Sequence, residues 1–188
     1  SFPWHIQKSL ARQRKAIEEL AELDFLERAE SVVLVGKPGV GKSGLASAIL
    51  LKALYAGRTA RAITAQNLFE EFEHSQADRS TKRLIKRLSS VEILLLDEFG
   101  YVQARTTPQI NQLFRLIDNR ASRKSTIITT NLGFEEWGGF LGDKALTAAL
   151  LSRLLQKSQV FCVEGVNLRD PAHKLPARAP KPPLTATS

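Results

Sequence analysis

The sequence predicts an α/β fold in which five parallel strands form one sheet with helices on both faces. Short β-branched or apolar runs alternate along the chain with segments of helical periodicity, and such alternation builds a parallel sheet through right-handed crossovers. A glycine-rich pattern at residues 36–43 directly follows one of these runs. Another run ends in two adjacent carboxylates, Asp97 and Glu98. Ligands of parallel α/β sheets bind at the carboxyl ends of the strands, so both features lie where a binding site is expected.

The chain has 188 residues, 43% of them hydrophobic, which is enough for one globular domain with its own core. Lys and Arg outnumber Asp and Glu by 27 to 19, and the net charge of +8 suits a polyanion, either nucleic acid or an acidic membrane surface. The single cysteine, Cys162, excludes an internal disulfide and a cysteine-based zinc site. Its apolar neighbours predict a buried thiol. No segment approaches the roughly 20 apolar residues of a membrane span, and we expect a cytoplasmic protein.

The first half of the chain is predicted to alternate between helix and strand. Residues 6–29 carry apolar side chains at helical spacing among many charges. The β-branched run at residues 32–35 is predicted to be a buried strand. The helix after it, over residues 42–56, has Gly57 where a C-cap belongs. A strand and two helices complete this half, over residues 61–64, 65–74 and 80–89.

The second half continues the alternation. Residues 91–96 form the most apolar of the predicted strands. Thr107 and Pro108 match a helix N-cap followed by proline at the first helical position. Asp143 precedes a further helix that it can cap. Two more strands are predicted, over residues 126–130 and 160–163.

We expect a folded core over residues 31–164, preceded by a helical linker over residues 1–30. Residues 165–188 hold five of the eight prolines, more basic than acidic side chains and no apolar periodicity. Such a composition buries too little apolar surface to fold by itself, so we expect a flexible tail unless a partner orders it.

Residues 36–43 read GKPGVGKS and satisfy the phosphate-loop pattern. Its glycines let backbone N–H groups turn around phosphate oxygens, and the helix N-terminus that follows adds partial positive charge. Lys42 is placed to reach the β- and γ-phosphates, and the Ser43 hydroxyl to take a Mg²⁺ position. The candidate phosphate-binding residues are Gly36, Pro38, Gly39, Val40, Gly41, Lys42, Ser43 and Gly44.

Asp97 and Glu98 form the second half of the predicted site. A carboxylate at the carboxyl end of a buried parallel strand is placed to hold Mg²⁺, and Asp97 is the candidate. Glu98 points to a different face and can polarise an attacking water. A solvent-facing acidic pair is the other interpretation, but the phosphate loop upstream favours the metal site. Two adjacent acids also favour hydrolysis of ATP over phosphate transfer to a small-molecule acceptor.

Asn131 and Arg153 are further candidates for the reaction. Asn131 follows the strand predicted over residues 126–130, where a polar side chain can orient water near the γ-phosphate, although a turn asparagine occupies the same kind of position. Arg153 lies at the edge of the apolar stripe of the helix after Asp143. It can complete a neighbouring subunit's site as an arginine finger, and a surface arginine matches the sequence equally well.

Basic side chains gather at two places. On the helix predicted over residues 80–89 they share one face that no acid interrupts, opposite the apolar side chains. A stripe of this kind can track DNA phosphates, although a solvated helix face has the same pattern. The candidate DNA-binding residues are Lys82, Arg83, Lys86 and Arg87 on this helix, with Arg120 and Arg123 around a later helix-to-strand turn.

With these motifs, the chain resembles the IstB-type transposition helper ATPases, which belong to the AAA+ clade together with bacterial helicase loaders and replication initiators. The stretches that carry the resemblance span most of residues 20–165. They are residues 20–30 (LAELDFLERAE), the phosphate loop, residues 95–101 (LLDEFGY), 125–132 (STIITTNL), 136–138 (EWG) and 150–155 (LLSRLL).

The resemblance implies a P-loop NTPase core of AAA+ type that binds ATP and Mg²⁺ between subunits. The roles that it implies are phosphate and metal binding for Lys42 and Ser43, metal binding for Asp97, water activation for Glu98, the first sensor for Asn131, the arginine finger for Arg153 and, on a looser match, the second sensor for Arg169.

Family members are described as assembling into rings or helices on duplex DNA and as recruiting a transposase. The resemblance therefore implies three partners, namely duplex DNA, further copies of this chain and a transposase. A helicase loader, with a replicative helicase as its partner, is the alternative, and a nucleotide-binding assembly module without significant turnover is a third possibility. Family members usually carry a small N-terminal domain before the matching segment, and we expect this chain to lack it.

Overall fold

The computed structural model describes residues 13–101 and 106–170 of the chain. Residues 1–12 of the expected linker and residues 171–188 of the expected tail lie outside the described residues. The elements in chain order are α2 (Arg14–Leu20), α3 (Asp24–Glu27), β1 (Ser31–Val35), α4 (Lys42–Tyr55), β2 (Ala60–Thr64), α5 (Ala65–Ala77), α6 (Thr81–Ser90), β3 (Ile93–Phe99), α7 (Thr107–Arg120), β4 (Ser125–Thr130), the 3₁₀ helix η1 (Phe134–Glu136), α8 (Trp137–Leu141), α9 (Lys144–Leu155) and β5 (Ser158–Cys162).

The five strands form one parallel sheet in the order β2-β3-β4-β1-β5, which confirms the predicted five-stranded parallel sheet. Strand β4 is central, and β1 and β3 pair with it on either side. The carboxyl ends of β1, β3 and β4 therefore meet at one edge of the sheet. The phosphate loop and both acidic residues belong to this edge.

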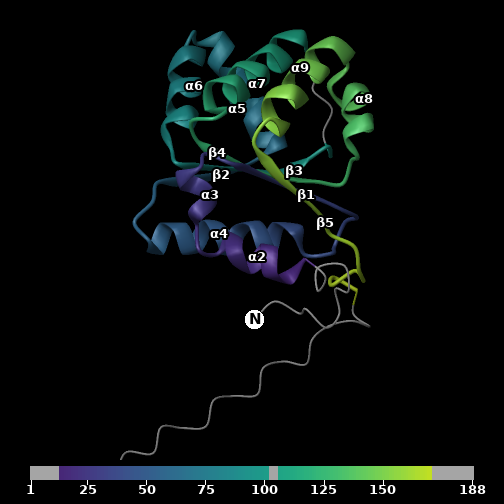
Figure 1. Cartoon of the computed structure of the whole chain (residues 1–188). Coiled ribbons are helices and arrows are strands. Elements are labelled where there is room, and N and C mark those ends of the chain that lie inside the picture. The colour runs from purple at the N-terminus through teal and green to yellow at the C-terminus, as the bar shows by residue number, and fades with distance from the viewer. Residues whose placement is uncertain (1–12, 102–105, 171–188) are drawn as a thin grey trace, which may run out of the picture.

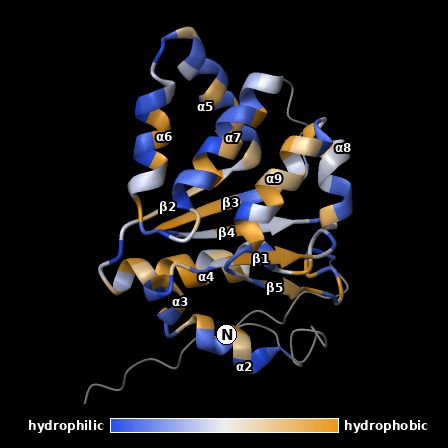
Figure 2. Cartoon of the chain, turned by 45° about the horizontal axis from the view of Figure 1, so that its top comes forward, coloured by the Kyte–Doolittle hydropathy of each residue, from blue (hydrophilic) through white to orange (hydrophobic). Residues whose placement is uncertain are grey.

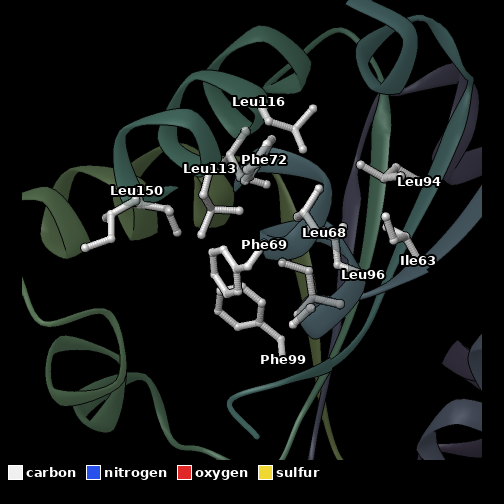
Figure 3. Close-up of a cluster of buried hydrophobic side chains, with 14 of the residues drawn as sticks. Ile63, Leu68, Phe69, Phe72, Leu94, Leu96, Phe99, Leu113, Leu116 and Leu150 are labelled. Carbon is white, nitrogen blue, oxygen red and sulfur yellow. The ribbon is translucent and has the colours of Figure 1, made fainter. Parts of the chain in front are cut away.

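Helices cover both faces of the sheet, as the sequence predicts (Figure 1). Helices α5, α6, α7, α8 and α9 lie on one face, and α2, α3 and α4 lie on the other. Alternation along β3 supplies both layers, because Leu94 and Leu96 belong to the core on the α5 side while Ile93 and Leu95 belong to the core on the α4 side. Figure 3 shows the first of these cores, in which Phe69, Phe99 and neighbouring leucines fill the space under the helices.

Strand β4 differs from its neighbours in polarity. In Figure 2 the strands β1 and β3 are mostly orange, the colour of hydrophobic residues, whereas β4 is pale. Its sequence, STIITT, places hydroxyl side chains at four of its six positions, and all six residues are buried. Buried hydroxyl groups need hydrogen-bond partners, so the partners of β4 are informative about the site.

The helix predicted over residues 6–29 is wrong in one respect, because the chain breaks it between α2 and α3. Leu23 adopts a left-handed conformation with a φ of 67°. In a continuous helix, side chains five residues apart point about 140° away from each other. The turn at Leu23 lets both Leu20 and Phe25 be buried in the same core.

Three local predictions have different outcomes. Asp143 caps α9, as predicted, by accepting a hydrogen bond from the backbone N–H of Leu146. The cap of α7 is Thr106 rather than Thr107. The prediction of a buried thiol at Cys162 is wrong, because Phe161 and Val163 point into the core and the alternation of a strand turns Cys162 outward.

Over the described ranges, no helix has both the length and the apolar character required to cross a bilayer.

Candidate nucleotide-binding site

The loop between β1 and α4 has the backbone of a phosphate-binding loop. Gly39 and Gly41 have φ values of 81° and 102°, a backbone conformation that residues with a Cβ rarely adopt. Gly41 is the N-cap of α4, and Lys42 is its first helical residue. The first N–H groups of a helix lack intrahelical partners, so the loop presents donors and partial positive charge to an anion at this point.

Lys42 lies inside the loop rather than in solvent. Its Nζ donates to the carbonyl oxygens of Gly36 at 2.7 Å and Lys37 at 2.9 Å, and only 7% of the residue is exposed. Burial lowers the pKa of Lys42, the charge of Asp97 opposes this shift, and the charge of Arg169 adds to it. A desolvated cation of this kind is stabilised by an anionic ligand, which the phosphates of a nucleotide would supply.

Asp97 lies at the carboxyl end of β3 and faces the loop. Its Oδ1 accepts a hydrogen bond from the Ser43 hydroxyl at 2.8 Å and another from the Thr129 hydroxyl. The structure thus brings together Ser43 and Asp97, the two predicted metal ligands, although they lie on different elements. Hydroxyl and carboxylate oxygens are the donor types that Mg²⁺ prefers, so this pair fits a Mg²⁺ ion that also contacts nucleotide phosphates.

Glu98 is held in an unusual backbone conformation next to Asp97. Its φ is 57°, in the left-handed region, and its backbone N–H donates to the Thr129 hydroxyl at 3.0 Å. The Glu98 side chain is exposed and lines the same pocket as Lys42. An exposed carboxylate in this position can accept a proton from a water molecule that lies between it and a bound phosphate.

A pocket of about 190 Å³ collects Lys42, Ser43 and Glu98, and Asp97 is joined to its lining through the hydrogen bonds from Ser43 and Thr129. The pocket is lined by Gly39, Gly41, Lys42, Ser43, Gly44, Glu98, Tyr101, Thr129, Leu168 and Arg169. Most of these residues are predicted from the sequence, and Tyr101, Thr129 and Leu168 are not. A hydroxyl residue in a buried strand beside the acidic strand end is the signal that could have marked Thr129, whereas nothing local in the sequence marks the other two.

The segment after β5 returns to the phosphate loop. The backbone N–H of Leu168 donates to the Gly39 carbonyl at 2.9 Å, and a Cβ built on Gly39 would lie 1.9 Å from Asn167 Oδ1. Position 39 therefore requires glycine for its close approach as well as for its φ. This return places Arg169, the second-sensor candidate, in the same pocket as Lys42.

Asn131 follows directly after β4, at the same edge of the sheet as the pocket. A Cβ on Gly100 would lie 3.2 Å from its Oδ1, so the side chain packs against the turn that follows Glu98. Among the described residues this buried Oδ1 has no hydrogen-bond partner. Asn131 thus lies beside the site with an unsatisfied amide oxygen, but it does not line the nucleotide pocket.

Arg153 lies far from this pocket within its own chain. Its Nε is 3.0 Å from Asp118 Oδ1, and it lines a small cavity together with Ser31, the first residue of β1. The phosphate loop follows the other end of β1, and a five-residue strand is about 17 Å long. The structure therefore does not bring Arg153 to the phosphate loop of the same chain.

The basic stripe predicted on α6 is exposed. Lys82, Arg83, Lys86 and Arg87 all lie on its solvent face, opposite the buried Leu84, Ile85 and Leu88. Arg87 pairs with Glu71 of α5, with its Nη2 2.9 Å from Oε2, so an acid from the neighbouring helix offsets part of the charge. Arg123, in the turn before β4, is also exposed.

The prediction that Arg120 contacts DNA is wrong. Arg120 is 1% exposed, and its guanidinium donates to the carbonyl oxygens of Leu88 at 2.8 Å and Val91 at 3.0 Å and to Thr126 Oγ1 at 3.0 Å. Burial lowers its pKa to about 10, so it remains charged at neutral pH. Arg120 joins the ends of α6 and α7 to the start of β4, and DNA cannot reach it.

Comparisons with known proteins identify the family and the fold of the chain. The chain matches the family described as IstB-like ATP binding protein over residues 1–175. A Pseudomonas aeruginosa protein, named for insertion sequence IS21 and for ATP binding, is 37% identical over 156 residues, which are 83% of this chain and 58% of that protein. The chain thus spans a little more than half the length of this relative.

Solved structures share the fold at lower identity. The crystal structure of the DnaC helicase loader has a TM-score of 0.69 at 22% identity and covers 83% of this chain and 90% of that one. AMPPCP-bound DnaA from Aquifex aeolicus has a TM-score of 0.68 at 17% identity, over 85% of this chain and 48% of that one. The fold is thus that of the AAA+ P-loop proteins, and by the family match over residues 1–175 the chain belongs to the IstB-like ATP-binding proteins.

Proposed function

We propose that this protein is an ATPase that binds duplex DNA, assembles on it with further copies of itself, and assists the transposase of its insertion sequence in choosing an insertion target. The observation that carries the proposal is the pocket that joins the phosphate loop to the acidic end of β3. Lys42, the Ser43–Asp97 pair and Glu98 supply a phosphate-binding cation, oxygen ligands for a metal and a carboxylate for water.

Each group would have a separate task in hydrolysis. Lys42 and the loop N–H groups bind the phosphates and hold them in position. Mg²⁺, held by Ser43 and Asp97, would offset the charge that develops on the phosphate oxygens. Glu98 orients a water molecule and accepts its proton as the water oxygen attacks the γ-phosphorus, while the bond from that phosphorus to the bridging oxygen breaks and ADP leaves with the electron pair. Arg169 adds a positive charge to the same pocket.

The position of Arg153 supports a shared site. Arg153 is half exposed, at 53%, and lies at the edge of the sheet opposite the phosphate loop. An arginine at this position can stabilise the transferring phosphate only in the pocket of a neighbouring copy, when the two copies pack against each other. ATP bound at such an interface would hold the copies together, and its hydrolysis would release them.

The α6 stripe and Arg123 support contact with DNA, because they are exposed basic side chains on a chain with a net charge of +8. The name of the IS21 relative places it in an insertion sequence, which favours a transposase as the protein partner. The helicase-loader alternative has the likeness to DnaC in its favour, and at 22% identity that likeness concerns the fold alone.

The test is ATP hydrolysis by the full chain with and without duplex DNA, for the wild type and for Glu98→Gln. We expect DNA to raise the rate, and we expect Glu98→Gln to bind ATP but not hydrolyse it, because the amide cannot accept the proton of water. Glu73→Gln, at an exposed position on α5, is the matched control and should hydrolyse at the wild-type rate. Hydrolysis that persists in Glu98→Gln would contradict the proposal.

A further inference from the structure

The four hydroxyl side chains of β4 have different kinds of partner. Three of them bond to structural groups, in that Ser125 donates to the Phe25 carbonyl, Thr126 accepts from Arg120 and Thr130 accepts from the backbone N–H of Leu132. Thr129 is different, because both of its partners are acids of the candidate site. It is 1% exposed and lines the nucleotide pocket.

One hydroxyl group connects the two acids. Thr129 Oγ1 accepts a hydrogen bond from the backbone N–H of Glu98 at 3.0 Å and donates to Asp97 Oδ1. A hydroxyl has a single proton, and a carboxylate can only accept, so the direction of both bonds is fixed. The Thr129 side chain therefore sets the orientation of Asp97 and the backbone position of Glu98 together.

Glu98 needs such support. Its φ of 57° is one that non-glycine residues hold only where the surrounding structure imposes it. The bond to Thr129 acts on the N–H of Glu98, and a second bond, from the Tyr101 N–H to the Glu98 carbonyl at 3.3 Å, acts on the other side. Loss of the hydroxyl would remove one of these two restraints on the strained backbone of Glu98.

Thr129 and Ser43 hold the same Asp97 oxygen from two different directions. Ser43 belongs to the helix that follows the phosphate loop, the part of the chain proposed to bind the nucleotide. Thr129 belongs to the central strand, at a register position opposite Leu34 of β1. Because β4 is paired on both sides and fully buried, Thr129 holds Asp97 from a rigid part of the sheet, separate from the phosphate loop.

We propose that Thr129 is a positioning residue of the ATPase site, one that fixes the metal-binding carboxylate of Asp97 and the water-activating Glu98 through a single hydroxyl group. The inference rests on the ATPase activity proposed above. In this proposal Thr129 does not contact the reacting atoms, and it acts only through Asp97 and Glu98.

The experiment compares Thr129→Val, Thr129→Ser and Thr130→Val in the full chain. Valine has the shape of threonine without the hydroxyl, serine keeps the hydroxyl, and Thr130 is an equally buried threonine of the same strand whose hydroxyl accepts from the Leu132 N–H and contacts neither acid. The kcat and KM for ATP are measured, together with the binding of a fluorescent ATP analogue with and without Mg²⁺.

We expect Thr129→Val to lower kcat about 10- to 100-fold, the usual effect of removing a group that orients a metal ligand. It should also reduce the gain in nucleotide affinity that Mg²⁺ provides, while binding without Mg²⁺ stays at the wild-type level. Thr129→Ser should restore both properties, and Thr130→Val should leave both unchanged. If Thr129→Val does not fold, Thr129→Cys, whose thiol is a weak donor, takes its place with the same expectation.

The inference is overturned if Thr129→Val keeps the wild-type kcat and Mg²⁺ dependence, or if Thr129→Ser is as impaired as Thr129→Val. An equal loss in Thr130→Val would also overturn it, because the effect would then belong to the strand rather than to the hydroxyl of Thr129. If the wild type itself does not hydrolyse ATP, the proposed function fails, and the Mg²⁺ dependence of analogue binding alone decides the role of Thr129.

Discussion

At the scale of single residues, buried charge explains the behaviour of both Lys42 and Arg120. Each cation donates to backbone carbonyl oxygens, and burial lowers the pKa of each. They differ in what lies beside them. Lys42 borders a pocket that an anion can enter, whereas Arg120 is enclosed by α6, α7 and β4. The surroundings thus suit Lys42 to anion binding and Arg120 to stabilising the fold.

Nucleotide affinity should depend on pH through Lys42. Its pKa is lowered from the ordinary value near 10.5, so the ammonium loses its proton at a lower pH than an exposed lysine does. A neutral amine cannot pair with phosphate, and affinity for an ATP analogue should fall as the pH rises through that lowered pKa. Titrations from neutral to alkaline pH test this for the wild type and Lys42→Arg. A parallel fall in both proteins would show that Lys42 is not the titrating group.

Replacing Arg120 should destabilise the fold without a direct effect on DNA binding. Arg120→Met leaves several buried carbonyl oxygens without a donor, and we expect a loss of about 3 kcal/mol in the free energy of unfolding. Arg123→Met, at an exposed position three residues later, should change the free energy of unfolding by less than about 0.5 kcal/mol. Urea denaturation of both variants measures this. Equal stabilities would contradict the structural role.

At the scale of elements, helix α6 combines a buried apolar face with an exposed basic face. Its apolar side packs into the core, and its basic side faces solvent, with Arg87 partly neutralised by Glu71. The remaining three basic residues, Lys82, Arg83 and Lys86, carry the charge that could contact phosphates. The sequence shows this stripe but cannot show Glu71 beside it, because that acid comes from another helix.

Charge reversal on α6 should weaken DNA binding and its salt dependence together. We expect Lys82→Glu with Lys86→Glu to reduce affinity for duplex DNA and to lower the slope of log affinity against log salt by about 1 for each DNA phosphate that the protein no longer neutralises. Lys15→Glu with Lys52→Glu makes the same change in net charge on α2 and α4, across the sheet, and should leave the slope unchanged. Fluorescence anisotropy over a range of salt concentrations tests both. Equal reductions in the two double variants would assign the effect to net charge alone.

Some secondary-structure elements could be predicted from the sequence and others could not. Strands β1 and β3 were predictable because their apolar runs leave no alternative, and Asp143 was predictable as a cap because its bond is local. Helix α8 was not, because it has five residues, two of them glycines, and is held by the burial of Trp137 against Phe99. Contacts of this kind are made by residues distant in sequence, so periodicity does not report them.

The same limit applies to the site. The phosphate loop and the two acids follow from local motifs, since each needs a particular residue at a particular spacing. Thr129 and Arg169 enter the pocket through the pairing of β4 beside β3 and through the return of the chain after β5. Arg120 was wrongly assigned because a basic residue near a turn has the same sequence pattern whether it faces solvent or the core.

At the scale of the whole molecule, the parallel sheet separates the two halves of the proposed site. The nucleotide pocket is at the carboxyl edge of the strands, and Arg153 is at the amino edge. Within a single copy, therefore, the proposed nucleotide pocket and the proposed finger cannot meet each other. This arrangement predicts that catalysis needs at least two copies and that its rate per copy rises with protein concentration.

Mixing two inactive variants tests the shared site most directly. Glu98→Gln has an intact Arg153 and an inactive pocket, and Arg153→Ala has an intact pocket and no finger. We expect each alone to hydrolyse ATP poorly in the presence of duplex DNA, and we expect a mixture of the two to recover activity, because the first variant offers its arginine to the pocket of the second. A mixture that is no more active than its components, or an Arg153→Ala variant that hydrolyses ATP at the wild-type rate, would contradict a site shared between subunits.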